Sequence, residues 1–420
     1  MTNLNNKFIG NEKKYLIETL KSKTSFVKKL ETKFSKKSKI SYSIAVNSGT
    51  SALHSALKAL DVGYGDEVLI PAHTVIMPTL VTLELNAMPV YVDIDPNTFN
   101  ICPRNLEKKI TKKTKAIIAV HMHGLPADMP AIMQIAKKNN IRVIEDAAQC
   151  LFGKINDKYV GSFGDIACYS FETKKHICGF EGGMITTNNE KFAKKARKFA
   201  GLGYQTLTGK SSLKQKLPNY FRSPEYKRHS SLGLNYRMNE PTAAVVLAQL
   251  ENSSKFVNRR IKVAGLFLKA IKNCHWLIPQ FVPVNYKNVY WTITLKYYGD
   301  KYIGLSWKRF LNLYSKEISE SFYAGLAVVP EETVLKNIKE IKKVLPIYNK
   351  CNYCKTLKSC IDTNKPYVCT NAYLVQPRLI QLKANQRNIK EVKQKALKLE
   401  KFIKRVESKF NNKNYNVKFI

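Results

Sequence analysis

Short apolar runs alternate with amphipathic stretches through the first half of the chain. The apolar runs are rich in β-branched residues and read "DEVLIPA", "PVYVDID", "KAIIAVHMHG", "IRVIEDAAQ", "IACYSFE" and "GGMITTN". Between several of them lie helical patterns such as "TSALHSALKALDVG" and "MPAIMQIAKKNN". Strands that alternate with helices predict a largely parallel sheet with helices on both faces.

Helical patterns flank this α/β region on both sides. Residues 9–35 place apolar side chains three and four positions apart, which predicts one or two amphipathic helices. After Asn235 the pattern becomes helical again, and a last helical stretch reads "NIKEVKQKALKLEKFIKRV". We therefore predict a large α/β domain with an N-terminal helical arm over residues 1–255 and a smaller C-terminal α/β domain over residues 256–420.

A formal charge of +39 is the most unusual global property of the chain. A balance this basic is typical of proteins that bind nucleic acids. The lysines, however, recur as short doublets along the whole length, without an arginine-rich arm or a concentrated basic tail. We therefore expect a dispersed lysine-rich surface and no nucleic-acid partner.

The apolar runs and the cysteines of the chain indicate where in the cell the protein is located. With 420 residues and 44% hydrophobic content, the chain can bury a sizeable core. No apolar run approaches the roughly 20 residues that span a bilayer, and the first residues lack the apolar core of a signal peptide. Nine cysteines, scattered and odd in number, fit reduced thiols. We expect a cytoplasmic protein without membrane insertion.

The stretch "NSGTSALHSAL" is a candidate anion site. A strand-like "YSIAV" runs into Gly49, Thr50 and Ser51, and a helical pattern follows. Backbone amides at the start of a helix bind phosphate, with hydroxyl groups alongside. The same residues suit an ordinary Ser/Thr helix cap, so the stretch alone leaves both interpretations open.

A buried carboxylate is predicted at the end of the run "VIEDAAQ". Glu145 and Asp146 end a strand-like run at the carboxyl edge of the sheet, where ligands bind in open α/β folds. A buried aspartate needs a partner, and the protonated ring nitrogen of a cofactor is one such partner. The alternative is that Asp146 caps a following helix.

Two adjacent lysines, Lys174 and Lys175, follow the next strand-like run in "YSFETKKHICGFEGG". A desolvated lysine loses its proton readily and forms a Schiff base with an aldehyde. A phosphate cradle, an acid for a ring nitrogen and a Schiff-base lysine therefore follow one another along the chain. This ordered set indicates pyridoxal 5'-phosphate (PLP) as the cofactor.

Eight segments of the chain follow one another in an order that one enzyme family shares. They are "FIGNEKKYLIETL", "AVNSGTSALHSAL", "GDEVLIPAHT", "PVYVDIDPNTFNI", "VHMHGLPADM", "VIEDAAQ", "GSFGDIACYSFETKKHICGFEGGMI" and "LGLNYRMNEPTAAVVLAQL". Together they resemble the DegT/DnrJ/EryC1/StrS family of PLP-dependent nucleotide-sugar aminotransferases, densely over residues 7–255. The resemblance implies fold type I, the aspartate aminotransferase-like α/β fold, with a mostly parallel central sheet in the large domain.

The resemblance also identifies the catalytic lysine. In the family, the Schiff-base lysine lies five positions after the serine of a Ser-Phe pair and six before the glutamate of Glu-Gly-Gly. Counting from Ser170 and from Glu181 leads to Lys175 in both cases, which leaves Lys174 as a neighbour. In a related dehydratase branch a histidine takes the place of this lysine. Here the lysine is kept and His176 follows it, which favours transamination, with His176 as a loop or wall residue.

The resemblance implies the remaining cofactor contacts. Asp146 pairs with the pyridine nitrogen, and Gln149 contacts the ring hydroxyl. Asn235 reaches the phosphate from the partner subunit of a homodimer with shared active sites. The phosphate ligands on the same subunit are Gly49, Thr50, Ser51 and Ser170.

The implied activity is transfer of an amino group, with glutamate as the donor, to a keto group of a nucleoside-diphosphate-linked sugar, for amino-sugar and surface-glycan biosynthesis. Two alternatives stay open: a PLP-dependent sugar dehydratase of the same family, and a PLP-binding regulator or degenerate enzyme without turnover. Three departures from the family motivate the second alternative: Val75, Phe180 and a C-terminal half whose substrate-facing parts do not match the family well. Val75 stands where the family usually stacks an aromatic residue on the cofactor ring. Phe180 replaces the usual glycine before Glu181, which we expect to change the loop or the pocket wall.

Four cysteines late in the chain form the pattern C-x2-C-x5-C-x8-C, which lies within the range of zinc sites. The last two spacings are irregular, so we favour free thiols and predict no metal. The residues concerned are Cys351, Cys354, Cys360 and Cys369.

Overall fold

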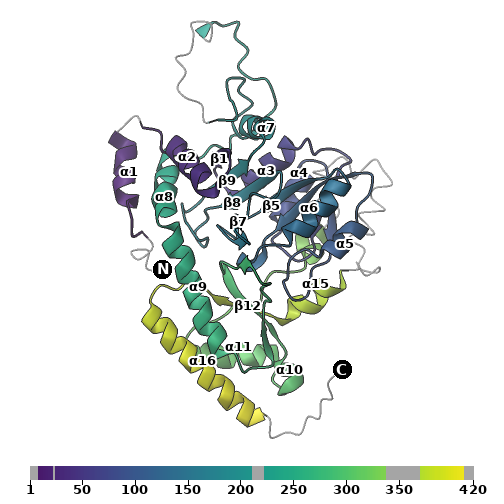
Figure 1. The fold of residues 1–420 in the computed structure, drawn as a ribbon, viewed down its shortest axis with the longest axis vertical. Coiled ribbons are helices and arrows are strands. Elements are labelled where there is room, and N and C mark those ends of the chain that lie inside the picture. Colours follow the sequence, from purple (N-terminus) through teal and green to yellow (C-terminus); the bar gives the residue numbers. More distant parts are fainter. Residues whose placement is uncertain (1–7, 22–23, 211–221, 337–368, 411–420) are drawn as a thin grey trace.

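A seven-stranded, mostly parallel sheet forms the centre of the N-terminal part of the protein (Figure 1). The computed structural model describes residues 8–21, 24–210, 222–336 and 369–410. Of the seven strands, only β9 runs antiparallel to its neighbours. In sheet order the strands are β1 (Tyr42–Val46), β9 (Gly183–Thr187), β8 (Ile166–Ser170), β5 (Arg142–Asp146), β4 (Thr114–Val120), β2 (Glu67–Pro71) and β3 (Met88–Val92). All six predicted apolar runs form strands of this sheet, and the predicted fold class is confirmed.

Helices cover both faces of this sheet because successive strand residues point to opposite sides. In β4, Ile118 and Val120 belong to a core cluster that includes residues of α3 and α7. Ile117 and Ala119 belong to another, which includes residues of α5 and α6. Burial on both faces explains why the strands read as near-continuous apolar runs. The helices of this region are α3 (Gly49–Ala59), α4 (Met77–Glu84), α5 (Pro103–Lys108), α6 (Met129–Lys138) and α7 (Glu190–Ala200).

The N-terminal arm consists of two helices that pack on α8 (Figure 1). The Glu240 carboxylate accepts hydrogen bonds from the N–H groups of Phe26 and Val27, at 2.5 and 3.1 Å. A negative charge at the start of a helix is favourable because the first N–H groups lack partners within the helix. The helical pattern predicted over residues 9–35 is thereby confirmed. The three helices are α1 (Glu12–Lys21), α2 (Phe26–Ser38) and α8 (Glu240–Glu251).

The C-terminal part is built on a three-stranded antiparallel sheet of order β10-β12-β13. Its core includes Trp276, Phe310 and Phe402. No helix within the described ranges is long and apolar enough to cross a membrane. The main elements are α9 (Ser253–Ala270), β10 (Leu277–Pro279), β12 (Thr292–Tyr297), α11 (Trp307–Ile318), β13 (Leu379–Lys383) and α16 (Ile389–Phe410). Shorter ones are η2 (Met122–Gly124), β6 (Lys154–Ile155), β7 (Lys158–Tyr159), β11 (Tyr286–Lys287), α10 (Gly299–Tyr302), η4 (Val329–Glu331), α12 (Thr333–Lys336), α15 (Thr370–Val375) and η6 (Gln376–Arg378).

Helix α9 links the two parts of the protein (Figure 1). Near its start, Phe256 and Val257 belong to a core cluster of the N-terminal part. Further along, Val263 and Phe267 belong to the core of the C-terminal part. The domain boundary expected near residue 255 falls inside this helix, and it stays a prediction.

The two parts approach each other closely at Gly124, which has a φ of +101°. The Val289 N–H donates to the Gly124 carbonyl at 2.9 Å. A Cβ added at Gly124 would lie 2.5 Å from the Tyr290 nitrogen and 2.6 Å from the Trp291 nitrogen. Only glycine leaves room for the backbone that passes here.

Replacement of Gly124 tests this close approach. Gly124→Ala is expected to lower the free energy of unfolding by at least about 2 kcal/mol, because the new Cβ meets two backbone nitrogens and the positive φ disfavours a side chain. Urea denaturation followed by tryptophan fluorescence measures the effect.

Gly265→Ala is the matched control. Gly265 lies in α9, and a Cβ added there meets open space. Alanine inside a helix is more stable than glycine by about 0.5–1 kcal/mol, so this variant is expected to be slightly stabilised. Equal destabilisation of both variants would contradict the argument.

Candidate active site

The carboxyl edge of the central sheet brings together three predicted site residues. Asp146 ends β5 and Ser170 ends β8, and these two strands pair in parallel. Lys175 follows β8 in a turn, in which its N–H donates to the Glu172 carbonyl at 2.9 Å. Because parallel strands end at the same edge, the turn that carries Lys175 lies close to Asp146.

The start of α3 lies against Ser170. A Cβ added at Gly49 would be 2.8 Å from the Ser170 Cβ, so glycine lets the first turn of the helix approach the strand end. Ser48 and Ser51 form a capping box, in which each side chain accepts from the other residue's N–H at 3.0 Å. The helix-cap interpretation is thereby confirmed for Ser48 as the N-cap residue, with Ser51 at the third helical position. Thr50 is exposed beside them, and anion binding by these residues stays a prediction.

Asp146 is almost completely buried, with 2% of its surface exposed. Its Oδ1 accepts a hydrogen bond from the Ala148 N–H at 3.0 Å. Burial raises the pKa of the Asp146 carboxyl, while the Ala148 N–H and the charge of Lys175 act to lower it. Residues 147–153 form no helix, so the helix-cap interpretation of Asp146 is wrong, and the side chain closes a local turn instead.

Lys175 and Lys174 lie in different surroundings. Lys175 is half-buried, and its Nζ lies 4.8 Å from the centroid of the Trp291 ring. Burial lowers the pKa of Lys175, and the Asp146 and Glu172 carboxylates partly counter this effect. Lys174 is exposed, and its N–H donates to the Glu172 side chain at 2.9 Å. Of the two, Lys175 has the environment that a nucleophilic amine needs.

Arg260 holds the backbone on which Lys175 stands. This buried guanidinium donates from Nη2 to the carbonyls of Lys174 and Lys175, both at 3.0 Å. From Nη1 it donates to the Trp291 carbonyl at 2.9 Å. One side chain of α9 therefore ties the lysine turn to the residue that precedes β12.

Gln149 follows Asp146 by three positions and is buried. A backbone N–H group holds its side chain. Its Oε1 accepts from the His123 N–H at 2.8 Å. His123 has a φ of +61°, and its Nδ1 lies 3.3 Å from the Thr292 hydroxyl. Burial lowers the pKa of His123 to about 3, so this ring is neutral at pH 7. The Gln149 oxygen is thus engaged by a backbone donor, and contact of Gln149 with a cofactor stays a prediction.

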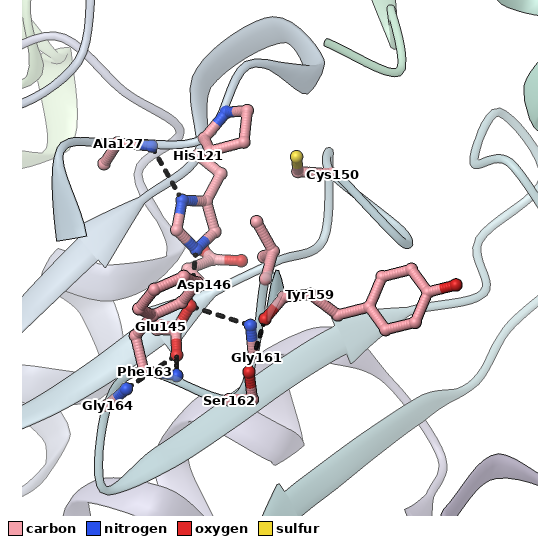
Figure 2. A network of polar contacts seen from close by, with 12 residues as sticks. His121, Ala127, Glu145, Asp146, Cys150, Tyr159, Gly161, Ser162, Phe163 and Gly164 are labelled. Atoms are coloured by element: carbon pink, nitrogen blue, oxygen red, sulfur yellow. Dashed lines mark hydrogen bonds and ion pairs between the residues drawn. The ribbon is translucent and has the colours of Figure 1, made fainter. Parts of the chain in front are cut away.

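Glu145 anchors the end of β5 on the side opposite to Asp146 (Figure 2). Its fully buried carboxylate accepts from His121 Nε2 at 3.1 Å. The Ala127 N–H donates to His121 Nδ1 at 3.0 Å, so the ring proton lies on Nε2 and points at Glu145. The carboxylate also accepts, each time at 2.7 Å, from the N–H groups of Gly161, Phe163 and Gly164. These four donors fix the strand end from which Asp146 projects.

The side chain of Asn235 does not join the other predicted site residues within one chain. Asn235 is exposed, and its Oδ1 accepts from Arg237 Nε at 3.0 Å. The neighbouring Tyr236 carbonyl accepts from the Asn47 N–H at 2.8 Å, so the Asn235 segment passes beside the start of α3.

The departures noted in the sequence lie in different settings. Phe180 is about half exposed, has a φ of +68° and packs on Phe8 with 5.5 Å between ring centroids. Val75 is partly buried after β2. His176 is buried and lies 3.0 Å through Nε2 from the Val289 carbonyl, which makes it a wall residue.

Of the four cysteines in the C-x2-C-x5-C-x8-C pattern, the structure describes Cys369. Cys351, Cys354 and Cys360 lie outside the described residues, and Cys369 is buried and forms no disulfide with a described residue. Across the part of the chain that the structure describes, no group of three or more histidine, cysteine or acidic residues is arranged to hold a metal ion.

Comparison with known proteins identifies relatives over most of the chain. Residues 7–301 match the model of the DegT/DnrJ/EryC1/StrS aminotransferase family. GDP-perosamine synthase of Escherichia coli O157:H7 is 38% identical over 269 residues, which cover 63% of this chain and 69% of that protein. UDP-N-acetyl-3-dehydro-alpha-D-glucosamine 3-aminotransferase of Acidithiobacillus ferrooxidans is 35% identical over 269 residues, 64% of this chain and 67% of that one. The solved structure of an aminotransferase from Psychrobacter cryohalolentis has a TM-score of 0.77 and 25% identity, and covers 96% of this chain and 97% of that one.

The central sheet and these relatives define the protein as an aminotransferase with the type I fold. The chain belongs to the DegT/DnrJ/EryC1/StrS aminotransferase family. The family predicted from the eight sequence segments is confirmed.

Sequence reasoning did not single out Arg260 and Trp291. Arg260 lies in the helical pattern "VNRRIKVAG" and Trp291 in the strand-like "NVYWTITLKY", and only the folded chain shows that the two residues meet at the lysine turn. Glu145 was visible as the second carboxylate of "VIEDAAQ". The sequence did not reveal its donors, because His121 follows β4 and the three backbone N–H groups come from the segment after β7.

Loss of the Glu145 charge tests the anchoring of β5. Glu145→Gln is expected to lower the free energy of unfolding by about 2 kcal/mol or more at neutral pH, because an amide nitrogen would face N–H donors. Burial acts to raise the pKa of Glu145, but the His121 and backbone hydrogen bonds hold it below the ordinary value of 4.5. Such a group stabilises the fold above its ordinary pKa, and this stability is lost as the pH falls through the folded pKa.

Wild-type protein is therefore expected to lose more stability than Glu145→Gln when the pH falls from about 6 to about 3.5. Urea midpoints at each pH measure the difference. Glu107→Gln is the control, because Glu107 pairs with Lys138 on an exposed surface at 3.0 Å and is expected to contribute less than about 0.5 kcal/mol. Parallel pH profiles for wild type and Glu145→Gln would contradict the anchoring role.

Proposed function

We propose that the protein transfers an amino group from glutamate to the keto group of a nucleoside-diphosphate-linked sugar, with PLP as cofactor. The observation that carries the proposal is the half-buried Lys175 beside the buried Asp146, in a chain of this aminotransferase family. The names of two relatives support the substrate class, since one contains a GDP-linked and the other a UDP-linked sugar. A net charge of +39 favours encounter with such an anionic substrate, which is an effect on rate and not on specificity.

The residues present fit the proposed cofactor. Gly49 keeps open, against Ser170, a space that a Cβ would fill, at a helix N-terminus that suits a phosphate. Asp146 supplies a buried carboxylate for a protonated ring nitrogen, and Lys175 supplies an amine for an aldehyde. When bound, PLP provides an electron sink for the negative charge that develops at the α-carbon of an amino acid.

Lys175 both holds the cofactor and moves protons in this proposal. Its lowered pKa raises the fraction of neutral amine, which is the form that attacks an aldehyde and accepts a proton from carbon. The Trp291 ring, 4.8 Å from Nζ, stabilises the amine once it is protonated. Arg260 keeps the backbone at Lys175 in place while the side chain changes partners.

We further propose a homodimer with shared active sites. The segment around Asn235 exposes the apolar side chains of Leu232 and Leu234. Adjacent exposed apolar side chains are typical of surfaces that another chain covers. The same segment passes beside the start of α3, where Tyr236 bonds to Asn47. A partner docked on this segment would bring its own phosphate cradle within reach of Asn235.

An absorption spectrum with and without glutamate tests the amino-donor half of the reaction. Wild-type protein is expected to show the visible band of PLP bound to a lysine, and glutamate is expected to remove it. Lys175→Ala is expected to lack this band and to lose at least about 10²-fold in rate, because it lacks the group that moves the proton. Lys174→Ala is the matched control and is expected to stay within about twofold of wild type, because its side chain is exposed.

Three other outcomes would redirect the assignment. A band that is indifferent both to glutamate and to loss of Lys175 would contradict the aminotransferase and favour a cofactor-binding regulator. Release of ammonia with a deoxy-sugar product would identify the dehydratase. If Lys174→Ala is as inactive as Lys175→Ala, the assignment of the nucleophile is wrong.

Mixing two inactive variants tests the shared site. In a dimer with shared sites, Lys175→Ala and Asn235→Ala chains would form hybrids with one intact site, because both changes fall in the other one. Random refolding of an equal mixture is expected to recover roughly a quarter of wild-type activity, since half of the dimers are hybrids. No recovery, with hybrids verified by native mass spectrometry, would contradict the role of Asn235 across the interface.

A further inference from the structure

A cluster of three arginines beside the lysine turn has no assigned role in the proposed reaction beyond the backbone contacts of Arg260. Arg259 and Arg260 lie in α9, and Arg387 follows β13 in the C-terminal part. These side chains line one cavity together with residues of the lysine turn and of the segment after β13. Its polar lining includes Lys175, His176, Arg259, Arg260, Asn385 and Arg387.

The positive charges of this cluster lack negative partners among the described residues. No carboxylate of a residue that the structure describes forms an ion pair with any of the three arginines. Arg260 is buried and donates only to neutral backbone carbonyls. Arg259 Nε and Arg387 Nη1 are buried atoms without a hydrogen-bond partner. Native structures rarely leave buried cationic donors unpaired, because the cost of removing them from water is then uncompensated.

The three guanidinium groups are close enough to repel one another. Burial, followed by the charges of Arg259 and Arg387, lowers the pKa of Arg260 to about 9. Burial and the charge of Arg259 lower the pKa of Arg387 as well. An anion bound among these side chains would replace mutual repulsion by attraction.

His176 presents an unpaired hydrogen-bond acceptor in the same cavity. Its Nε2 lies 3.0 Å from the Val289 carbonyl, which can only accept, so Nε2 carries the proton and Nδ1 is an acceptor. Nδ1 is buried without a partner, and His176 lines the same cavity. The arginines therefore need acceptor oxygens, and His176 needs a hydrogen-bond donor.

We propose that Arg259, Arg260 and Arg387 form a binding site for a small oxoanion that also carries a hydrogen-bond donor. Guanidinium groups match the oxygens of carboxylate and phosphate in a forked geometry. Two sources share the required chemistry: hydrogen phosphate, which donates through its hydroxyl, and a free amino acid, which donates through its ammonium group. The site goes beyond the proposed function and does not depend on it.

Occupation of this site would connect the lysine turn to both parts of the protein. Arg260 already bonds to the backbone of Lys175, and Arg387 comes from the C-terminal part. An anion shared by these two side chains links them through a ligand rather than through direct contact. The bound state is therefore expected to hold the lysine turn more firmly against α9.

Equilibrium dialysis tests the proposal on PLP-loaded protein in phosphate-free buffer, with radiolabelled inorganic phosphate and radiolabelled L-glutamate as separate probes. At least one probe is expected to bind saturably. Its Kd is expected to rise at least about tenfold in Arg387→Gln and in Arg259→Gln, because each change removes a charged donor. Arg104→Gln, which removes an exposed positive charge on α5, is the control and is expected to stay within about twofold.

Each outcome of the dialysis decides one question. Binding of phosphate alone that depends on Arg387 identifies free phosphate as the ligand, and binding of glutamate alone identifies the amino acid. Absence of binding by both probes would overturn the proposal, as would equal weakening by Arg387→Gln and Arg104→Gln. Arg387-dependent binding in a protein that never reacts with glutamate would keep this site and sink the aminotransferase reaction.

Discussion

The attraction between the Lys175 amine and the buried Asp146 carboxylate is the interaction on which the proposed chemistry depends. Burial raises the pKa of Asp146 and lowers the pKa of Lys175, because it disfavours the charged form of each group. The charge of each partner partly counters this shift. This balance between burial and attraction leaves the pKa of Lys175 below its ordinary value. It is possible only because β5 and β8 are neighbours and end at the same edge of the sheet.

Much of the surrounding structure holds this pair in place. On one side of β5 the Glu145 carboxylate gathers His121 and three backbone N–H groups, which fixes the strand end (Figure 2). Behind the lysine turn, Arg260 ties the backbone of Lys175 to Trp291. These supports come from α9, from His121 after β4 and from a loop after β7, so the site is assembled by segments far apart in the sequence.

The sequence predicted the central sheet well because its strands are buried on both faces and read as apolar runs between helical patterns. The sequence also predicted that Gly49, Asp146 and Lys175 belong to one site. Each of these residues lies at or just after the end of a strand, and these strands end at the same edge of the sheet. The sequence did not reveal Arg260 or Trp291, because a helical arginine and a strand aromatic look ordinary until the chain folds. The helix that the alternative interpretation placed after Asp146 does not form, and the carboxylate accepts from the Ala148 N–H instead.

Covalent labelling of the lysine tests the central claim most directly. Wild-type protein loaded with PLP would be treated with borohydride, which fixes a cofactor bound to an amine, and then digested and mapped by mass spectrometry. The account predicts stoichiometric labelling of Lys175 and none above background at the adjacent, exposed Lys174. Labelling at Lys174, or labelling scattered over many surface lysines with Lys175 unmodified, would contradict it.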